Sequence, residues 1–234
     1  MQAIPKIIHQ VWSGIDGDLP TCFEKYGETW KAHYPEWKYE LWNHQRMNDF
    51  VQQMYPQYWN IYNNFPYHIQ RWDAIRYLIL YEMGGLYADF DYESIKSMEE
   101  IITDKSCCFS AEPTVRKKIV FNNALMISLP KNWFMKKIIE NVFSEKNVLY
   151  PKYPKGKCVM NTTGPWMLVK LYEALSEEEK ESIYLIPAES VTPIDWFQAQ
   201  RLNNNVLDKQ GMKALEDAYA VHRFFGTWWE NDTI

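Results

Sequence analysis

The sequence of 234 residues carries 25 Lys and Arg against 30 Asp and Glu. The resulting formal charge of −5 argues against a general nucleic-acid binder, which needs a basic face. The length suits one domain with a sizeable core, and no apolar run approaches the roughly 18 residues of a membrane-spanning helix. Aromatic residues are abundant, with 11 Trp, 16 Tyr and 11 Phe, and we expect most of these rings in the core.

Strands and helices are predicted to alternate along the chain. The predicted strands cover residues 6–12, 37–42, 86–92, 107–111, 119–128, 182–188 and 218–222. The predicted helices cover residues 21–33, 46–62 with a break near Pro56, 68–83, 131–144 and 164–175. This alternation predicts one α/β domain over residues 1–234, built around a mainly parallel sheet. Such sheets bind ligands beyond the carboxyl ends of their strands.

The cysteines and the N-terminus bear on cellular location. The four cysteines include no C-x-x-C pair, so we expect neither a zinc site nor a disulfide framework. Reduced thiols favour a cytoplasmic protein. The start, MQAIPKIIHQVW, lacks the charged n-region and long apolar core of a signal peptide. We therefore expect a soluble cytoplasmic protein, or one that rests on the inner face of the cell membrane.

Two carboxylates follow the predicted strand that begins at residue 86. Asp89 and Asp91 stand two residues apart in LYADFDY. If the chain bends where the strand ends, both side chains can converge on one hard cation such as Mn²⁺ or Mg²⁺, which is often shared with substrate phosphates. The alternative interpretation is a polar strand end with two solvated acids.

A second polar pair precedes these carboxylates on the helix predicted over residues 68–83. Asp73 and Arg76 are three apart and share one helix face. One interpretation is a surface salt bridge, which contributes little to stability. The other is a nucleotide-sugar pocket, because the helix leads through Gly84 and Gly85 directly to the acidic pair. In such a pocket a carboxylate accepts sugar hydroxyls beside a fixed cation.

For two further segments the residues alone leave two interpretations. Asn122 and Asn123 follow a β-branched run, and a bound sugar or a turn would equally satisfy their amides. The segment YPKYPKGK alternates aromatic residues, prolines and lysines, and we expect a loop there. It is either a solvated loop or a lip that contacts an acceptor or an anionic membrane surface.

At these motifs the sequence resembles glycosyltransferase family 32, whose members carry a sugar-binding region with a DXD motif. IPKIIHQVW and WKYELWN resemble the first two strands of the family, and RWDAIRYLILYEMGGLYADFDYES resembles its central signature. FNNALMIS, TGP and HRFFGTW resemble weaker downstream blocks. The resemblance covers most of the chain and implies a GT-A (Rossmann-like) fold and a retaining transfer from a nucleotide sugar.

The resemblance also implies roles for individual residues. Trp12 would stack on the nucleobase, although a core role is the alternative, and Asp73, Arg76 and Asn123 would bind the donor. Asp89 and Asp91 would hold Mn²⁺ or Mg²⁺, with His222 as a third ligand. Thr227 and Trp228 would contact the diphosphate, within a C-terminal segment, residues 222–234, that could act as a lid on the active site.

The predicted reaction moves a hexosyl group from a nucleoside diphosphate sugar to a hydroxyl of a glycan or lipid-linked acceptor, in surface polysaccharide synthesis such as that of a capsule. A UDP-sugar donor is favoured, with GDP-mannose as the alternative. No residue is marked as a nucleophile for a double displacement, which favours a front-face path. There are two alternative functions. One is a haloacid-dehalogenase-type phosphatase, in which Thr or Val is expected at the position that Glu93 occupies here. The other is a non-catalytic sugar-binding module.

Overall fold

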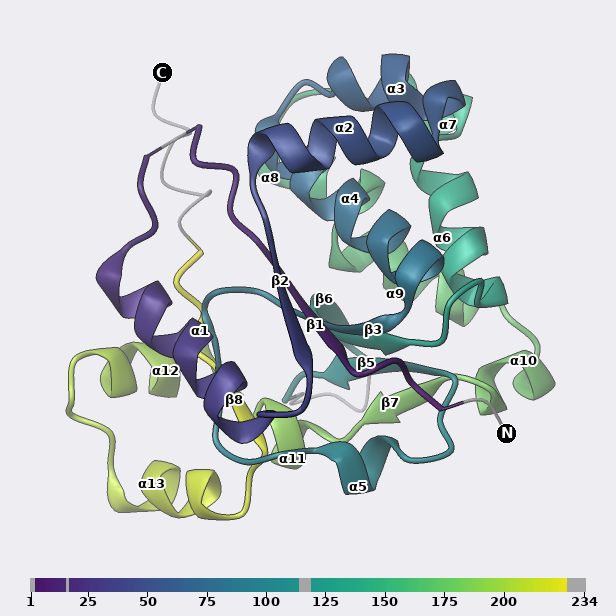
Figure 1. Cartoon of the computed structure of the whole chain (residues 1–234). Coiled ribbons are helices and arrows are strands. Elements are labelled where there is room, and N and C mark those ends of the chain that lie inside the picture. Colours follow the sequence, from purple (N-terminus) through teal and green to yellow (C-terminus); the bar gives the residue numbers. More distant parts are fainter. Residues whose placement is uncertain (1–2, 16, 114–118, 227–234) are drawn as a thin grey trace.

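The fold is described from a computed structural model, which places residues 3–15, 17–113 and 119–226 (Figure 1). The strands are β1 (Ile7–Val11), β2 (Lys38–Trp42), β3 (Gly85–Ala88), β4 (Tyr92–Ser94), β5 (Cys107–Ala111), β6 (Phe121–Ser128), β7 (Tyr184–Ile186) and β8 (Ala220–His222). The longer helices are α1 (Thr21–His33), α2 (His44–Met54), α3 (Pro56–Asn63), α4 (His68–Met83), α6 (Trp133–Val142), α8 (Lys155–Thr162), α9 (Pro165–Glu173), α12 (Trp196–Asn203) and α13 (Lys209–Glu216). The short helices are α5 (Glu99–Ile102), α7 (Glu145–Val148), α10 (Glu177–Glu181) and α11 (Ala188–Val191).

The central sheet has the strand order β2-β1-β3-β6-β5-β7. β1 pairs in parallel with β2 and β3, and β5 pairs in parallel with β7. β6 runs antiparallel to both of its neighbours, β3 and β5. The predicted α/β fold with a mainly parallel sheet is therefore confirmed, with β6 as the reversed strand. A separate two-stranded sheet joins β4 to β8.

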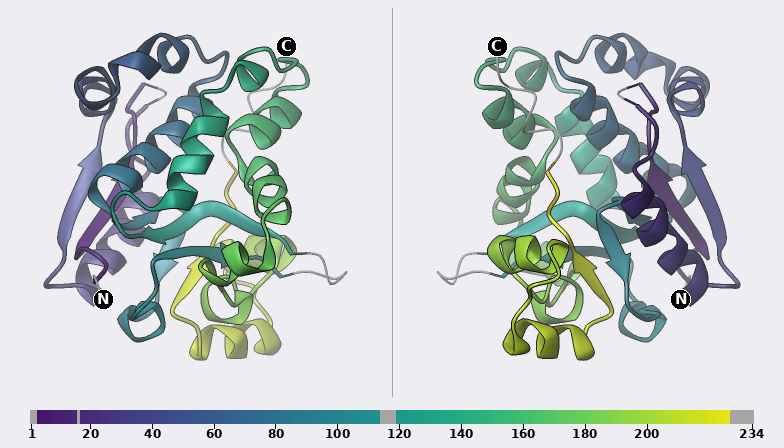
Figure 2. Two further views of the ribbon diagram at one scale, coloured as in Figure 1. Left: turned by 90° about the vertical axis from the view of Figure 1, so that its right-hand side faces the viewer. Right: turned by 90° about the vertical axis from the view of Figure 1, so that its left-hand side faces the viewer.

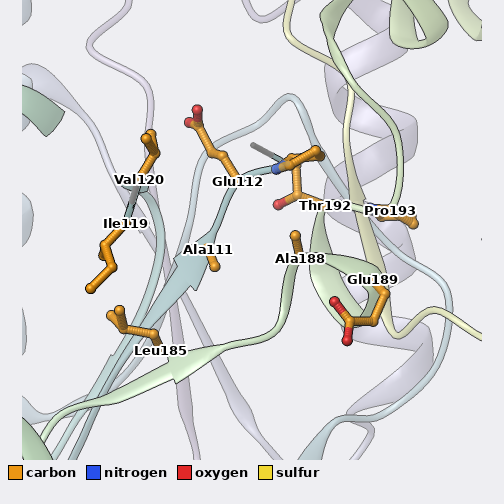
Figure 3. Close-up of a pocket in the computed structure, with 10 residues that line it drawn as sticks. Ala111, Glu112, Ile119, Val120, Leu185, Ala188, Glu189, Thr192 and Pro193 are labelled. Atoms are coloured by element: carbon orange, nitrogen blue, oxygen red, sulfur yellow. The ribbon is translucent and has the colours of Figure 1, made fainter. Parts of the chain in front are cut away.

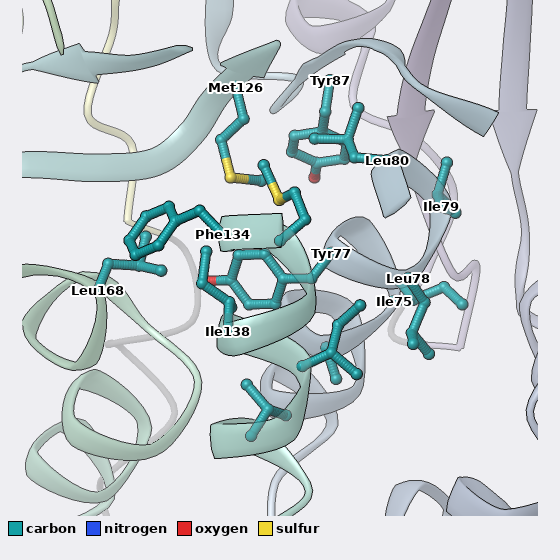
Figure 4. Packing of buried hydrophobic residues seen from close by; sticks show 14 of the residues in the cluster. Ile75, Tyr77, Leu78, Ile79, Leu80, Tyr87, Met126, Phe134, Ile138 and Leu168 are labelled. Atoms are coloured by element: carbon teal, nitrogen blue, oxygen red, sulfur yellow. The ribbon is translucent and has the colours of Figure 1, made fainter. Parts of the chain in front are cut away.

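Alternation along the strands supplies two cores, one on each face of the sheet. Tyr87 and Met126 enter a cluster with helices α4, α6 and α9, shown in Figure 4. Leu86 and Ile127 point to the opposite face and pack with Trp30 of α1. Figure 1 and the two side views of Figure 2 show helices on both sides of the sheet.

Helix α4 lies at the centre of the fold. Every residue from Asp73 to Leu80 is buried, so this helix is enclosed on nearly all sides rather than along one stripe. A charged residue inside such a helix is largely shielded from water, so it needs partners within the protein. The Asp73–Arg76 pair therefore belongs to the interior.

The turn from α4 into β3 requires glycine. Gly84 and Gly85 both have positive φ, at 66° and 98°. A Cβ on Gly85 would lie 2.5 Å from the carbonyl oxygen of Ile7, so any side chain there would push β3 away from β1. The glycine pair thus sets the close approach of the two strands that carry Trp12 and Asp89 at their ends.

Three expectations from the sequence need correction. The strand expected over residues 86–92 ends at Ala88, and residues 89–91 form a turn into β4 of the second sheet. The loop expected over YPKYPKGK, residues 150–157, ends earlier, because α8 begins at Lys155. His222 is the last residue of β8, so a terminal lid cannot begin there. Thr227 and Trp228 lie outside the described residues.

The described chain bears on two other expectations. All four cysteines carry free thiols. Among residues 3–15, 17–113 and 119–226, no helix combines the length and apolar character needed to cross a bilayer.

Candidate active site

A pocket of about 1010 Å³ opens where β1 and β3 end. Because these strands are parallel, their carboxyl ends meet at one edge of the sheet, the usual ligand position in α/β proteins. The predicted site residues that line the pocket are Trp12, Asp73, Arg76, Asp89, Asp91, Asn123 and His222. The fold thus brings together every predicted site residue that falls within its described part.

Arg76 connects the two acidic motifs. Its Nη1 donates to Asp89 Oδ2 at 3.0 Å, and its Nη2 lies 3.3 Å from Asp73 Oδ1. Arg76 and Asp73 each expose only 4% of their surface, which excludes the surface salt bridge considered from the sequence. Tyr87 also donates to Asp89, from its hydroxyl to Oδ1 at 2.5 Å. Asp89 is therefore held by a cation and a phenol on opposite oxygens.

Both carboxylate oxygens of Asp73 also accept hydrogen bonds from neighbouring side chains. Its Oδ1 accepts from the side-chain amide of Asn123 at 2.9 Å, and its Oδ2 accepts from the hydroxyl of Thr163 at 2.8 Å. The same Asn123 amide also lies 2.9 Å from the hydroxyl of Tyr77. Asn123 thus sits in a buried network rather than a turn, beside the Asp73–Arg76 pair.

Burial and charge act in opposition on these carboxyl groups. Burial raises the pKa of Asp73, although Arg76 opposes the shift. Burial likewise raises the pKa of Asp89, where Arg76 opposes the shift and Asp91 adds to it. One guanidinium is shared between the buried carboxylate of Asp73 and the half-buried carboxylate of Asp89, with Asp91 nearby. This wall of the pocket therefore carries an excess of negative charge that suits a cation.

Asp91 and His222 form the second polar centre. Asp91 Oδ1 lies 3.4 Å from His222 Nε2, and its Oδ2 accepts from the backbone N–H of Phe225 at 3.1 Å. Burial acts to raise the pKa of Asp91, but His222 and the Phe225 amide outweigh it and hold the pKa below its usual range. Burial acts to lower the pKa of His222, and the Asp91 carboxylate outweighs it and raises the pKa.

The pairing of two strands places His222 beside Asp91. β4 and β8 pair antiparallel, with Tyr92 opposite His222. The two rings stack with centroids 4.7 Å apart, and Phe224 covers His222 at 4.0 Å. The backbone N–H of Arg223 donates to the carbonyl of Asp91 at 2.8 Å. The end of β8 is therefore fastened to the second acid of the DXD turn.

The Asp91–His222 pair has the chemistry of an incomplete cation site. The Nδ1 atom of His222 is buried and has no hydrogen-bond partner among the described residues. Within the same residues, no group of three or more His, Cys, Asp and Glu side chains is gathered to hold a metal ion by itself. A carboxylate and an imidazole suit Mn²⁺, and Mg²⁺ or Mn²⁺ commonly takes its remaining oxygens from substrate phosphates and water. These residues therefore fit a divalent cation that binds together with a phosphorylated ligand.

Trp12 lies at the other end of the pocket, directly after β1. Its Nε1 donates to the carbonyl of Gly17 at 3.1 Å, and its ring meets Phe23 and Phe90 edge-on at 5.9 and 6.2 Å. The ring is half-buried, so part of it still faces the pocket. Such a fixed, flat surface suits stacking on a base.

Several pocket residues were not anticipated from the sequence. Glu112 and Trp196 line the pocket, and Tyr87, Thr163 and Phe225 contact its acidic groups. Thr163 is the first residue of the TGP block noted above, which was a usable signal. Tyr87 belongs to the central signature and Phe225 to the HRFFGTW block, whereas Glu112 and Trp196 come from segments without a motif.

A smaller groove of about 540 Å³ adjoins the pocket and shares Glu112 with it. Figure 3 shows this groove between Ile119 and Leu185 on one side and Ala188, Thr192 and Pro193 on the other. It contains little charge other than that of Glu112 and Glu189.

Comparison with known proteins agrees with this geometry. Residues 20–108, which include α4 and the DXD turn, match the sequence family described as "Glycosyltransferase sugar-binding region containing DXD motif". This segment belongs to that family. It contributes Asp73, Arg76, Asp89 and Asp91, whereas Trp12 and His222 lie outside it.

Relatives and solved structures extend the similarity beyond the DXD segment. The chain is 28% identical to inositol phosphoceramide mannosyltransferase 1 of Schizosaccharomyces pombe, over 80% of this chain and 57% of the relative. It is 30% identical to mannosyl phosphorylinositol ceramide synthase CSH1 of Saccharomyces cerevisiae, over 70% of this chain and 41% of the relative. The chain thus spans about half the length of these two proteins.

The fold is that of GT-A glycosyltransferases. The UDP-bound glycosyltransferase domain of the YGT toxin superposes with a TM-score of 0.54 at 11% identity, over 92% of this chain and 89% of that domain. The GT-A fold expected from the sequence is confirmed.

Proposed function

We propose that this protein is a retaining, metal-dependent glycosyltransferase, which moves a hexosyl group from a nucleoside diphosphate sugar to a hydroxyl of a glycan or lipid-linked acceptor. The observation that carries the proposal is the pocket itself. It joins a flat aromatic surface at Trp12, the ion-paired Asp73–Arg76–Asp89 cluster and the Asp91–His222 pair within one volume of about 1010 Å³. These parts correspond to the base, sugar and diphosphate of one donor.

The roles of the residues follow from their chemistry. The ring of Trp12 stacks on the base, and the Asp73 and Asp89 carboxylates accept hydrogen bonds from sugar hydroxyls. Arg76 holds both carboxylates in place. Asp91 and His222 would hold a divalent cation, with Asp89 predicted to join them, and that cation would stabilise the charge that develops on the departing diphosphate.

The stereochemical path follows from how the carboxylates are held. A double displacement needs a free carboxylate against the anomeric carbon. Asp73 accepts hydrogen bonds from Asn123 and Thr163, and Asp89 accepts them from Arg76 and Tyr87, so neither is free for attack. We therefore propose a front-face path, in which the acceptor hydroxyl approaches on the side of the leaving phosphate and transfers its proton to it.

The donor we favour remains a UDP-sugar, as expected from the sequence. The mannosyl alternative has its own support, since both fungal relatives carry mannosyl transfer or mannosyl lipid synthesis in their names. The test is a panel of UDP- and GDP-sugars incubated with the protein and Mn²⁺, with release of the nucleoside diphosphate as the signal. Cleavage of GDP-mannose in preference to every UDP-sugar would establish the alternative.

A contact with the membrane surface is the second part of the proposal. Residues 149–157 present exposed Leu149 and Tyr153 next to Lys152, and Lys157 follows on α8. Apolar side chains beside lysines favour the surface of an anionic leaflet. The names of the relatives refer to ceramides, which agrees with a lipid-linked acceptor. We propose a cytoplasmic protein that works at the inner face of the membrane, in surface polysaccharide synthesis. Co-sedimentation with vesicles of neutral and anionic lipid tests the contact, and equal recovery with both would contradict it.

A further inference from the structure

An exposed tryptophan lies at the edge of the pocket, away from Trp12. Trp196 exposes 53% of its surface and lines the pocket, and its neighbour Phe197 exposes 73%. The two rings meet edge-on with centroids 5.1 Å apart. Large aromatic rings are usually buried, so an exposed ring beside a ligand pocket indicates a surface that a ligand covers.

The helix that carries Trp196 is held in place by hydrogen bonds. Trp196 is the first residue of α12, which Asp195 caps by accepting from the backbone N–H of Gln198 at 2.8 Å. The side chain of Gln200 donates to the carbonyl of Phe224 at 3.1 Å, and that of Asn203 donates to the carbonyl of Arg223 at 2.9 Å. These bonds fasten α12 to the segment that directly follows His222. The position of Trp196 relative to the Asp91–His222 pair is therefore fixed.

Glu112 supplies a polar group on the same side of the pocket. Its Oε1 accepts from the side-chain amide of Asn122 at 3.0 Å, and Asn122 in turn accepts from the Ser110 hydroxyl at 2.8 Å. Figure 3 shows its carboxylate turned away from Leu185 and Ala188 of the small groove. Glu112 shares the wall of that groove with Thr192 and Pro193, a few residues before Trp196. The bond with Asn122 leaves most of the accepting capacity of this carboxylate for a ligand.

The donor does not need these two residues. Phe225 contacts Phe23 at 5.2 Å on the Trp12 side, whereas Phe224 is bonded to α12 on the other side. The segment that follows His222 therefore contacts the Trp12 side of the pocket through Phe225 and the helix of Trp196 through Phe224. A volume of about 1010 Å³ is at the upper end of the roughly 300–1,000 Å³ typical of a site for one small molecule. The pocket accordingly has room for a second substrate beyond the diphosphate.

We propose that Trp196 and Glu112 form the acceptor subsite, for a neutral hexopyranose ring. The apolar face of the sugar stacks on the Trp196 ring, and a ring hydroxyl donates to the Glu112 carboxylate. Glu112 disfavours a phosphate at this point because like charges repel. The inference rests on the proposed function, and it identifies the part of the pocket that selects the acceptor.

The experiment measures hexoside binding separately from nucleotide binding. Methyl hexopyranosides of the gluco, galacto and manno series serve as probes in saturation-transfer NMR, with UDP and Mg²⁺ present. The wild-type protein should give saturation transfer to at least one hexoside, and UDP should not displace it. Trp196→Ala and Glu112→Gln should each raise the Kd of that hexoside about tenfold, while the Kd of UDP stays within about twofold.

Trp166→Ala is the matched control, since Trp166 lies in the first turn of α9, is 49% exposed and does not line the pocket. It should change neither Kd, and Trp196→Phe should restore part of the hexoside binding. Two results would overturn the subsite: no hexoside bound by the wild-type protein, or a loss of UDP binding in Trp196→Ala equal to the loss of hexoside. Failure of the wild-type protein to bind any nucleotide would instead count against the proposed function.

Discussion

The guanidinium of Arg76 and the carboxylate of Asp89 lie 3.0 Å apart, which joins the central helix α4 to the DXD turn. The same Nη1 atom donates to the backbone carbonyl of Asn123 at 2.9 Å, so β6 meets the other two elements at one point. Arg76 also stacks over the ring of Tyr87 at 4.7 Å. The orientation of Asp89 is thus set by three different elements of the fold.

Replacing Arg76 by Met should destabilise the protein strongly. The change leaves the buried Asp73 and the half-buried Asp89 without their cation, and loss of one partner of a buried ion pair such as Asp73–Arg76 costs about 3–5 kcal/mol. Urea unfolding measures the difference. Arg201→Gln is the control, because Arg201 pairs with Asp208 on the surface and should change the free energy of unfolding by no more than about 1 kcal/mol. Equal effects for the two variants would contradict the central role of Arg76.

Asp91→Asn should remove activity and leave the fold intact. The amide oxygen of Asn can still accept from the backbone N–H of Phe225, but the charge that a cation needs is gone. Loss of one charge-stabilising group typically lowers turnover about 10²–10³-fold. Titration with Mn²⁺ in the presence of UDP should show weakened metal binding, and the circular dichroism spectrum should be unchanged. Near-normal turnover in this variant would refute the metal-binding role of Asp91.

UDP together with Mn²⁺ should raise the melting temperature, and UDP with EDTA should do so much less. At a ligand concentration of 100 times Kd the stabilisation is about 2.7 kcal/mol. For a chain of this size the free-energy gain corresponds to an increase of roughly 5–10 °C. Differential scanning fluorimetry gives the measurement. A larger increase in melting temperature with GDP than with UDP would show that the donor is a GDP-sugar and not a UDP-sugar.

Stability should fall in acid because of His9. This buried ring has Nε2 3.0 Å from the carbonyl of Gly84, and its Nδ1 accepts from Trp42 Nε1 at 3.2 Å. Burial lowers the pKa of His9 to about 4 from 6.5. As the pH falls, the His9 ring is therefore protonated in the unfolded chain at a higher pH than in the folded protein. The stability that the neutral His9 contributes is complete above pH 6.5 and is lost as the pH falls towards 4.

The matched measurement uses His9→Gln, whose amide can donate to Gly84 and accept from Trp42. When the pH is lowered from 7.5 to 4.5, the free energy of unfolding, measured in urea, should fall by about 2–3 kcal/mol more for the wild-type protein than for the variant. Carboxylates contribute to acid unfolding in both proteins and cancel in the comparison. Parallel pH profiles for the two proteins would show that His9 is not held neutral.

Truncation after Gly226 tests the expectation that the C-terminal residues close over the donor. The cut keeps His222 in β8 and the bond from Phe225 to Asp91, so the core should fold. If the removed residues cover the diphosphate, UDP–Mn²⁺ binding should weaken and hydrolysis of the donor should rise relative to transfer, because water enters more easily. Unchanged UDP affinity and an unchanged ratio of hydrolysis to transfer would dismiss the lid.

Much of the fold could be predicted from local patterns. The boundaries of α1 and α4 follow from helical periodicity together with Pro35 and the glycine pair at residues 84–85, and the structure reproduces them. The end of β3 at Ala88 was missed because the aromatic and apolar residues of LYADFDY continue through the turn. The strand ends there because the backbone turns, and the amide of Tyr92 donates to the carbonyl of Asp89 at 3.0 Å across that turn.

The acidic motifs of the site were predictable for a similar reason. Asp73, Arg76, Asp89 and Asp91 lie within one short segment, so their spacing alone indicates proximity. Glu112 and Trp196 come from segments that are distant in sequence, and nothing local distinguishes them from ordinary surface residues. The place of Trp196 depends on how α12 is fastened to the residues after β8, and that of Glu112 depends on its bond with Asn122. Spacing along the chain cannot reveal either contact.

The most direct test of the central claim is the release of nucleoside diphosphate from a panel of UDP- and GDP-sugars, measured with Mn²⁺ and with EDTA. The account predicts that at least one nucleotide sugar is cleaved slowly by the wild-type protein with Mn²⁺. It also predicts that EDTA or Asp91→Asn abolishes this cleavage, while Trp166→Ala does not. If no nucleotide sugar is bound or cleaved with Mn²⁺, or if Asp91→Asn cleaves it as fast as the wild-type protein, the account is contradicted.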